Sequence, residues 1–438
     1  MSSDLDDRAR DNMGRLLLVL VGALMLNLGF QLWGILPPGD WVSMILVVYA
    51  YGTALGLFIA ALVDVDLDRY GYHITGWVGF VIVASTVTIL WLRAGTNFGT
   101  DALLFSRYSV DLLLNGRNPF AESMAPATAV YDASILHVTP QVDGTHITSL
   151  SYPAGMVWAF VPQAATGFGG LNLGETLLVA SVVVLVFLVL ESPPSLALMP
   201  IVVLLGARNL LWASAGGLLD VLWLVPLLVA MHYWHGERYG AAALAYGLAA
   251  GTKQTVWPIA PALAIWLWND AEDLDEFVDR ASTCIRGGLA GFLALNLPFM
   301  VWNFEAWARS VFTPISSGAP MIHQGVGPTL ASVAGVYALP KDYYTLLTVA
   351  SFVVALGVYA LYWDRMKWVA WVLPPIVLFW YYRSLNSYFT WFLPVAYYAL
   401  ICALDLRRER WAPVERLNRL IARLIVRLNR GTPEVPDR

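Results

Sequence analysis

The feature that most constrains this chain is a series of apolar runs, several of which are long enough to cross a membrane. A helix needs about 20 apolar residues to span the hydrocarbon core of a bilayer. The clearest runs are Leu16–Ile35, Val42–Val63, Ile74–Leu92, Gly287–Trp302 and Tyr343–Trp363. Bilayers tolerate only helices and closed barrels as spanning structures, and these runs lack the alternation of barrel strands. The sequence therefore predicts an all-α, polytopic transmembrane helical bundle.

Composition supports this fold class and excludes several functions. Only 13% of the residues are charged and 58% are apolar, whereas a soluble domain is about one quarter charged. The net charge of −5 gives no indication of a nucleic-acid partner. The two cysteines, Cys284 and Cys402, form no metal-binding or disulfide pattern. Asp64–Asp68 has the spacing of an EF-hand loop, but Arg69 stands where that loop needs glycine. We therefore expect no required metal and no cofactor.

Basic residues predict the orientation of the chain in a cell membrane. The tail 406–438 is rich in arginine and has an amphipathic pattern, which places it on the cytoplasmic side, held by anionic lipid. Counting from both ends agrees on about twelve crossings if Tyr152–Phe168 enters the membrane without crossing it. We divide the chain into two N-terminal transmembrane helices (1–73), a transmembrane core (74–405) and this tail.

Two external loops, 94–151 and 303–342, are far longer than most connections in helical bundles. Long ordered loops usually carry function. The first loop should contain a juxtamembrane helix that begins at Thr100-Asp101 and ends near Leu114, because Asn-Gly and Asn-Pro pairs follow. The catalytic or binding chemistry is therefore expected on the external side.

Short motifs in and after the first loop resemble those of the GT-C class of polytopic membrane glycosyltransferases. Those enzymes carry an acidic residue early in the first external loop, then a Gly-x-Asn-Pro-aromatic turn and a Tyr-Pro motif. Here Asp101, Asn115–Phe120 and Tyr152-Pro153 occupy these places. Gly217–Asp220 resembles the external turn of the class that carries a polar residue.

The resemblance covers roughly Ile74 to Leu404, and its motifs are short. Gly251-Thr252-Lys253, after a helix of small residues, resembles the loop lysine of the class. Two features depart from the class: two extra spans precede the core, and the common Tyr-Pro-Pro is Tyr-Pro-Ala here.

The resemblance implies inverting transfer of a hexose, often mannose, from a polyprenyl- or dolichyl-phosphate donor to a glycan or glycolipid acceptor. Such a reaction needs a base for the acceptor hydroxyl, and Asp101 is the candidate. The alternative role for Asp101 is a helix N-cap, since Asp is favoured immediately before a helix. Asp101→Asn separates the two roles, because asparagine caps a helix but is no base.

The donor phosphate needs cations, for which Lys253, Arg383 and Arg208 are the candidates. A charge within a membrane is expensive and usually functional, although each of these residues can instead extend to the interface. Four further residues are candidates for substrate binding: His323, Glu122, Tyr152 and Asp220. For His323 the alternative is a solvated loop histidine.

A transporter or flippase is the main alternative, because many chains with this many apolar runs move solutes. Transporters favour inverted repeats and discontinuous helices, and no internal repeat is visible here. A non-enzymatic assembly protein is the second alternative. The Trp- and Tyr-rich external segments suit a carbohydrate site, so we expect a glycosyltransferase whose partners are a lipid-phosphate sugar, a glycan acceptor and membrane lipid.

Overall fold

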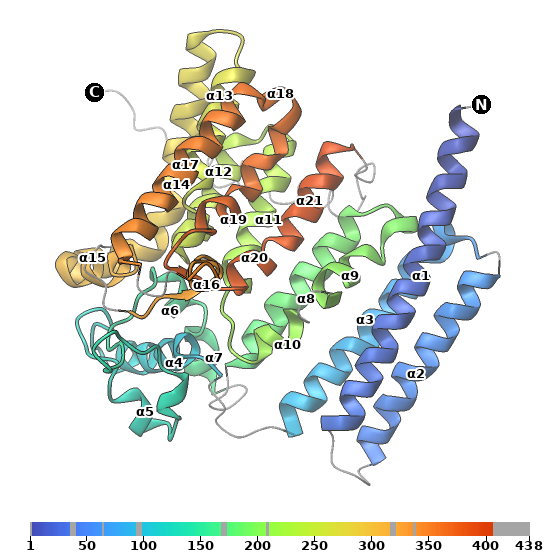
Figure 1. Cartoon of the computed structure of the whole chain (residues 1–438), viewed down its shortest axis with the longest axis horizontal. Helices are drawn as coiled ribbons and strands as arrows, with labels where there is room; N and C mark the ends of the chain where they lie inside the picture. The colour runs from blue at the N-terminus through green and yellow to red at the C-terminus, as the bar shows by residue number, and fades with distance from the viewer. Residues whose placement is uncertain are drawn as a thin grey trace, which may run out of the picture.

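The computed structural model describes residues 2–35, 41–63, 65–92, 99–167, 173–206, 210–315, 321–335 and 339–405. Within these ranges the chain is helical apart from turns, isolated bridges and one two-stranded parallel ladder (Figure 1). The all-α prediction is thereby confirmed. Arg208 and the tail 406–438 lie outside the described residues.

Six of the described helices are long and apolar enough to cross a membrane. Their apolar spans are Asn12–Gly34, Met44–Leu62, Leu67–Ile89, Gly174–Glu191, Leu274–Trp302 and Lys341–Leu361. All the runs singled out in the sequence fall within or overlap these spans. Four shorter apolar helical segments accompany them: Pro194–Leu205, Val221–His235, Tyr239–Ala250 and Ser387–Ala403.

The N-terminal helices form a bundle on one flank of the molecule (Figure 1). They are α1 (Ser2–Ile35), α2 (Trp41–Leu62) and α3 (Leu67–Leu92). Glycines let α1 approach α2 closely, since a Cβ at Gly22 would lie 2.7 Å from the Phe58 ring. Helix α3 runs without a break past residue 73, the boundary inferred from the sequence, and packs against α1 and α2 on one side and against α8 and α10 on the other.

The remaining helices of the bundle pack beside this flank. They are α8 (Gly174–Glu191), α9 (Met199–Gly206), α10 (Leu210–Ala215), α11 (Val221–His235), α12 (Tyr239–Ala250), α13 (Ile259–Asp270), α14 (Leu274–Trp302), α17 (Lys341–Leu361), α18 (Trp363–Met366), α19 (Leu373–Leu378) and α21 (Leu393–Ala403). Helices α12 and α14 touch through small residues, as membrane helices often do. A Cβ at Gly247 would lie 2.1 Å from the Gly288 carbonyl oxygen, so only glycine permits this approach.

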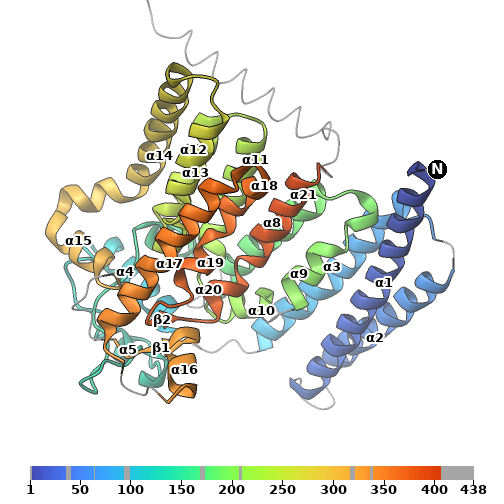
Figure 2. The ribbon, with the colours of Figure 1, turned by 45° about the horizontal axis from the view of Figure 1, so that its top comes forward.

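The loop elements gather at one end of the bundle, at the lower left in Figure 2. They are α4 (Asp101–Leu114), α5 (Ala127–Val130), α6 (Gly155–Trp158), α7 (Val161–Thr166), α15 (Phe304–Phe312), α16 (Val326–Val333), α20 (Ser387–Thr390) and the strands β1 (Gln324–Gly325) and β2 (Arg383–Ser384). Helix α4 has the bounds expected from the sequence. Neither α6 nor α7 is long enough to cross a bilayer, in agreement with the prediction for Tyr152–Phe168.

The two long loops contact each other at this end. Gln141 of the first loop forms an isolated bridge with Met321 of the second. The Ile322 N–H also donates to the Pro140 carbonyl oxygen at 3.3 Å. Both loops therefore lie on the same side of the bundle, as the sequence predicts, and residues from both can contribute to one site.

Candidate functional site

Asp101 is the first residue of α4, but it does not cap that helix. Thr100 is the N-cap, because its Oγ1 accepts a hydrogen bond from the Leu103 N–H at 3.2 Å. The capping alternative for Asp101 is therefore wrong. The Asp101 side chain leaves the helix, and its Oδ2 accepts from the Thr139 N–H at 3.0 Å. Among the described residues, Oδ1 of Asp101 has no hydrogen-bond partner.

Glycines allow the start of α4 to pack closely against the turn that precedes α11. A Cβ at Gly99 would lie 2.2 Å from the Gly216 carbonyl oxygen. Gly217 adopts φ 105°, which favours glycine, and its carbonyl accepts from the Thr100 hydroxyl at 2.7 Å. This close approach ties the Asp101 end of α4 to the turn that leads into Asp220.

Asp220 and Lys253 form a buried ion pair. The Lys253 ammonium donates to Oδ1 of Asp220 at 2.7 Å, and the two side chains are 8% and 3% exposed. The indole N–H of Trp223 donates to the same oxygen at 2.9 Å. The charge of Lys253 is therefore compensated within the protein. Lys253 is therefore neither an unpaired phosphate-binding lysine nor a lysine that extends to the membrane interface.

Two tyrosine rings flank the Lys253 ammonium. Its Nζ lies 5.1 Å from the ring centre of Tyr388 and 5.8 Å from that of Tyr152. Burial raises the pKa of Tyr152 well above its usual range, and the charges of Asp101 and Asp220 raise it further. Tyr152 therefore stays neutral and is no base. The same interactions place Tyr152 within electrostatic reach of both carboxylates.

Arg383 reaches the site from β2. The parallel ladder pairs Gln324 with Arg383 and Gly325 with Ser384. Gly325 has a φ of 113° and lies directly against the Ser384 backbone. The Arg383 Nη2 donates to the Thr139 Oγ1 at 3.3 Å. Its Nη1 is buried and has no hydrogen-bond partner in the described structure. A buried charged donor without a partner is costly, and an anion would satisfy it.

Thr139 thus joins the candidate base to the candidate cation. Its N–H binds Asp101 and its hydroxyl oxygen binds the Arg383 guanidinium. Asp101, Arg383, Tyr152, Asp220 and Lys253 are therefore brought together, although they come from five separate stretches of the chain.

His323 and Glu122 occupy other positions. The His323 ring is half-buried and lies 5.3 Å from the ring of Tyr344 and 5.8 Å from that of Tyr382. Burial, followed by the charge of Lys341, lowers the pKa of His323, so it is not the freely solvated histidine of the alternative interpretation. Near the surface, both carboxylate oxygens of Glu122 accept hydrogen bonds from the Arg117 guanidinium, at 3.1 and 2.7 Å.

Asn296 was not singled out from the sequence, yet it holds the site together. It is fully buried in α14, and its Oδ1 accepts from the Ala154 N–H at 2.9 Å and from the Trp307 indole at 3.1 Å. Its Nδ2 donates to the Gly251 carbonyl oxygen at 3.2 Å. A polar amide within an apolar run was the signal that could have identified it.

The Tyr152-Pro153 turn meets the Lys253 turn through these contacts and one glycine. The Gly155 N–H donates to the Gly251 carbonyl oxygen at 3.0 Å. A Cβ at Gly155 would lie 2.3 Å from the Thr252 hydroxyl, so a larger residue would separate the two turns. Thr139, Trp223 and Tyr388 were likewise missed, since hydroxyl and aromatic residues are common throughout the chain.

No family model, curated protein or solved structure matches this chain. A functional interpretation therefore depends on the residues of the site and on their geometry.

Proposed function

We propose that this protein is an integral membrane glycosyltransferase. It transfers a hexose, with mannose as the first candidate, from a polyprenyl-phosphate donor to a lipid-linked or surface glycan acceptor. The observation that carries the proposal is the link Asp101–Thr139–Arg383, which joins a carboxylate to a guanidinium with an unpaired buried donor. A base and a phosphate-binding cation are the two groups that this reaction needs.

In the proposed reaction the acceptor hydroxyl oxygen attacks the anomeric carbon of the donor sugar. The bond from that carbon to the phosphate oxygen breaks, and the lipid phosphate leaves with the electron pair. The hydroxyl proton passes to Asp101, whose Oδ1 has no hydrogen-bond partner among the described residues. Direct displacement inverts the anomeric centre. Because phosphate is already a tolerable leaving group, no strong acid is required.

We assign the donor phosphate first to Arg383 and only second to Lys253. Arg383 has a buried N–H group without a partner, whereas the charge of Lys253 is balanced by Asp220 at 2.7 Å. An ammonium has three N–H donors, so Lys253 retains donors that a phosphate can use. Its role is then to position a phosphate oxygen, while Arg383 supplies the uncompensated charge.

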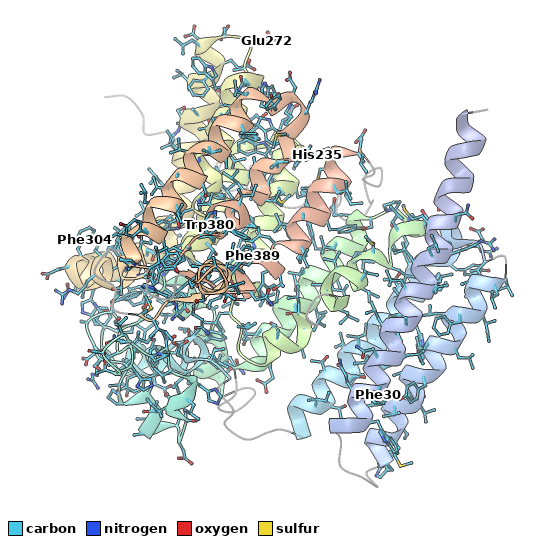
Figure 3. The ribbon with its side chains drawn as sticks, viewed as in Figure 1. Phe30, His235, Glu272, Phe304, Trp380 and Phe389 are labelled. Atoms are coloured by element: carbon cyan, nitrogen blue, oxygen red, sulfur yellow. The ribbon has the colours of Figure 1, made fainter. Side chains whose placement is uncertain are left out.

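We further propose that the site faces the external side of a bundle with about twelve crossings. Two observations support this orientation. The connections that carry His235 and Glu272 lie at the end of the bundle away from Phe304 (Figure 3). Arg238 follows His235, and Arg280 and Arg286 lie in the part of α14 that follows Glu272, as basic residues do near the cytoplasmic side. The count of about twelve is the one inferred from the sequence; among the described residues, six long apolar spans and four shorter apolar helical segments account for ten of these crossings.

The experiment that tests the function is reconstitution of the purified protein in liposomes with radiolabelled polyprenyl-phosphate mannose or glucose and a lipid extract as acceptor. We expect radiolabel in the acceptor fraction with one of these donors. Comparison of surface and lipid-linked glycans in a deletion strain by mass spectrometry identifies the sugar, since the strain should accumulate a glycan that lacks it. Movement of donor across the bilayer without transfer would instead identify a flippase.

A further inference from the structure

Thr139 lies at the base of a short hairpin that is held on both sides. The Ile147 N–H donates to the Thr139 carbonyl oxygen at 3.0 Å, and the Gln141 N–H donates to that of Thr145 at 2.7 Å. Gln141 also bridges to Met321 of the second long loop. The backbone at Thr139 is therefore fixed by contacts that involve neither Asp101 nor Arg383.

Thr139 uses a different group for each of its two partners in the site. Its backbone N–H donates to Oδ2 of Asp101 at 3.0 Å. Its side-chain Oγ1 accepts from Nη2 of Arg383 at 3.3 Å. A side-chain substitution at this position therefore alters the contact with the cation while the contact with the carboxylate remains.

We propose that Thr139 is a positioning residue that holds the Arg383 guanidinium in a fixed place beside Asp101. The inference rests on the proposed function, in which Arg383 binds the donor phosphate. With Nη2 engaged by Thr139, the guanidinium is restrained and its Nη1 remains for the phosphate. Preorganised donors bind without the cost of ordering a long side chain at the moment of binding.

The experiment compares donor saturation curves for the full-length parent, Thr139→Val and Thr139→Ser. Valine matches threonine in shape but has no acceptor for Arg383, so the donor KM should rise about fivefold to tenfold, as expected for loss of one modest hydrogen bond. The kcat should stay within about twofold, because the N–H bond to Asp101 is retained. Serine keeps the hydroxyl and should restore the KM.

Thr145→Val is the matched control. The Thr145 hydroxyl donates to the Gln141 and Asp143 side chains within the same hairpin. If Thr139 serves only to stabilise the hairpin, both valine variants should change the kinetics alike. An unchanged donor KM in Thr139→Val, no rescue by serine, or an equal effect in Thr145→Val would each refute the proposal.

A double-mutant cycle separates failure of this inference from failure of the proposed function. If the parent transfers no sugar from any lipid-phosphate donor, the proposed function fails. Thermal unfolding of the parent, Thr139→Val, Arg383→Gln and the double variant in detergent still measures the contact between the two residues. Non-additive effects support the restraint of Arg383 by Thr139, and additive effects refute it.

Discussion

Replacement of Asp101 by asparagine tests the proposed base, because it removes the charge and leaves the helix cap and the contact with Thr139 in place. Thr100 caps α4, so the cap is intact in the variant. The asparagine side-chain oxygen can still accept from the Thr139 N–H, which binds Oδ2 of Asp101 at 3.0 Å in the parent. The structural cost is then the loss of a negative charge in the first turn of a helix, about 0.3–1 kcal/mol.

The loss of activity should be far larger than this cost. An amide accepts no proton at neutral pH, and general-base assistance contributes about 10²–10⁴-fold to the rate. We therefore expect Asp101→Asn to unfold near the temperature of the parent, to bind the lipid donor, and to transfer sugar at least about 10²-fold more slowly. Single-turnover transfer in proteoliposomes, together with thermal unfolding in detergent, measures both quantities on one sample.

Two further variants complete this test. Asp143→Asn is the matched control, since Asp143 is an exposed residue at the hairpin tip whose side chain accepts from the Thr145 N–H; its activity should equal that of the parent. Asp101→Ala should lose transfer and in addition destabilise the fold by about 1–3 kcal/mol, because the Thr139 N–H loses its acceptor. A transfer rate for Asp101→Asn within about threefold of the parent would refute the assignment, since a lost base implies about 10²-fold or more.

Three other predictions concern the ion pair, the topology and pH. Lys253→Gln should lower the unfolding free energy by about 3–5 kcal/mol, because it leaves a buried carboxylate uncompensated; thermal unfolding should show that a variant neutralising both members of the pair is more stable than this one. In a background without the native cysteines, Asp143→Cys and Thr329→Cys should react with an impermeant thiol reagent on intact cells, whereas Glu272→Cys should not; labelling of only one loop position would contradict the topology. The pKa of His323 is lowered from 6.5 by burial, so its stabilising contribution is complete above pH 6.5 and is lost as the pH falls towards the folded-state pKa; His323→Gln should flatten the dependence of unfolding on pH in this range, and an unchanged slope would show that His323 is not its source.

Local properties of the sequence determined the fold class and several parts of the site. Membrane helices follow from the length and hydropathy of single segments, so α1, α2 and α17 were recognisable without any tertiary contact. The bounds of α4 follow from a Thr before it and an Asn-Gly pair after it, which act within one turn of helix. Short motifs in the sequence also predicted that an acidic residue and several cations lie on one side of the bundle.

The pairing of these residues was decided by the tertiary structure alone. Lys253 meets Asp220 across 33 residues, and Arg383 meets Thr139 across 244. Such pairs depend on where separate helices come to rest, and that depends on close approaches such as the one at Gly99 and Gly216. Hydropathy patterns and local residue spacing repeat over a few residues, so they do not indicate which residues pair across such long stretches of sequence. The sequence therefore predicted which residues carry charge near the site, whereas packing determined that Lys253 is neutralised while the Arg383 guanidinium keeps an unpaired donor.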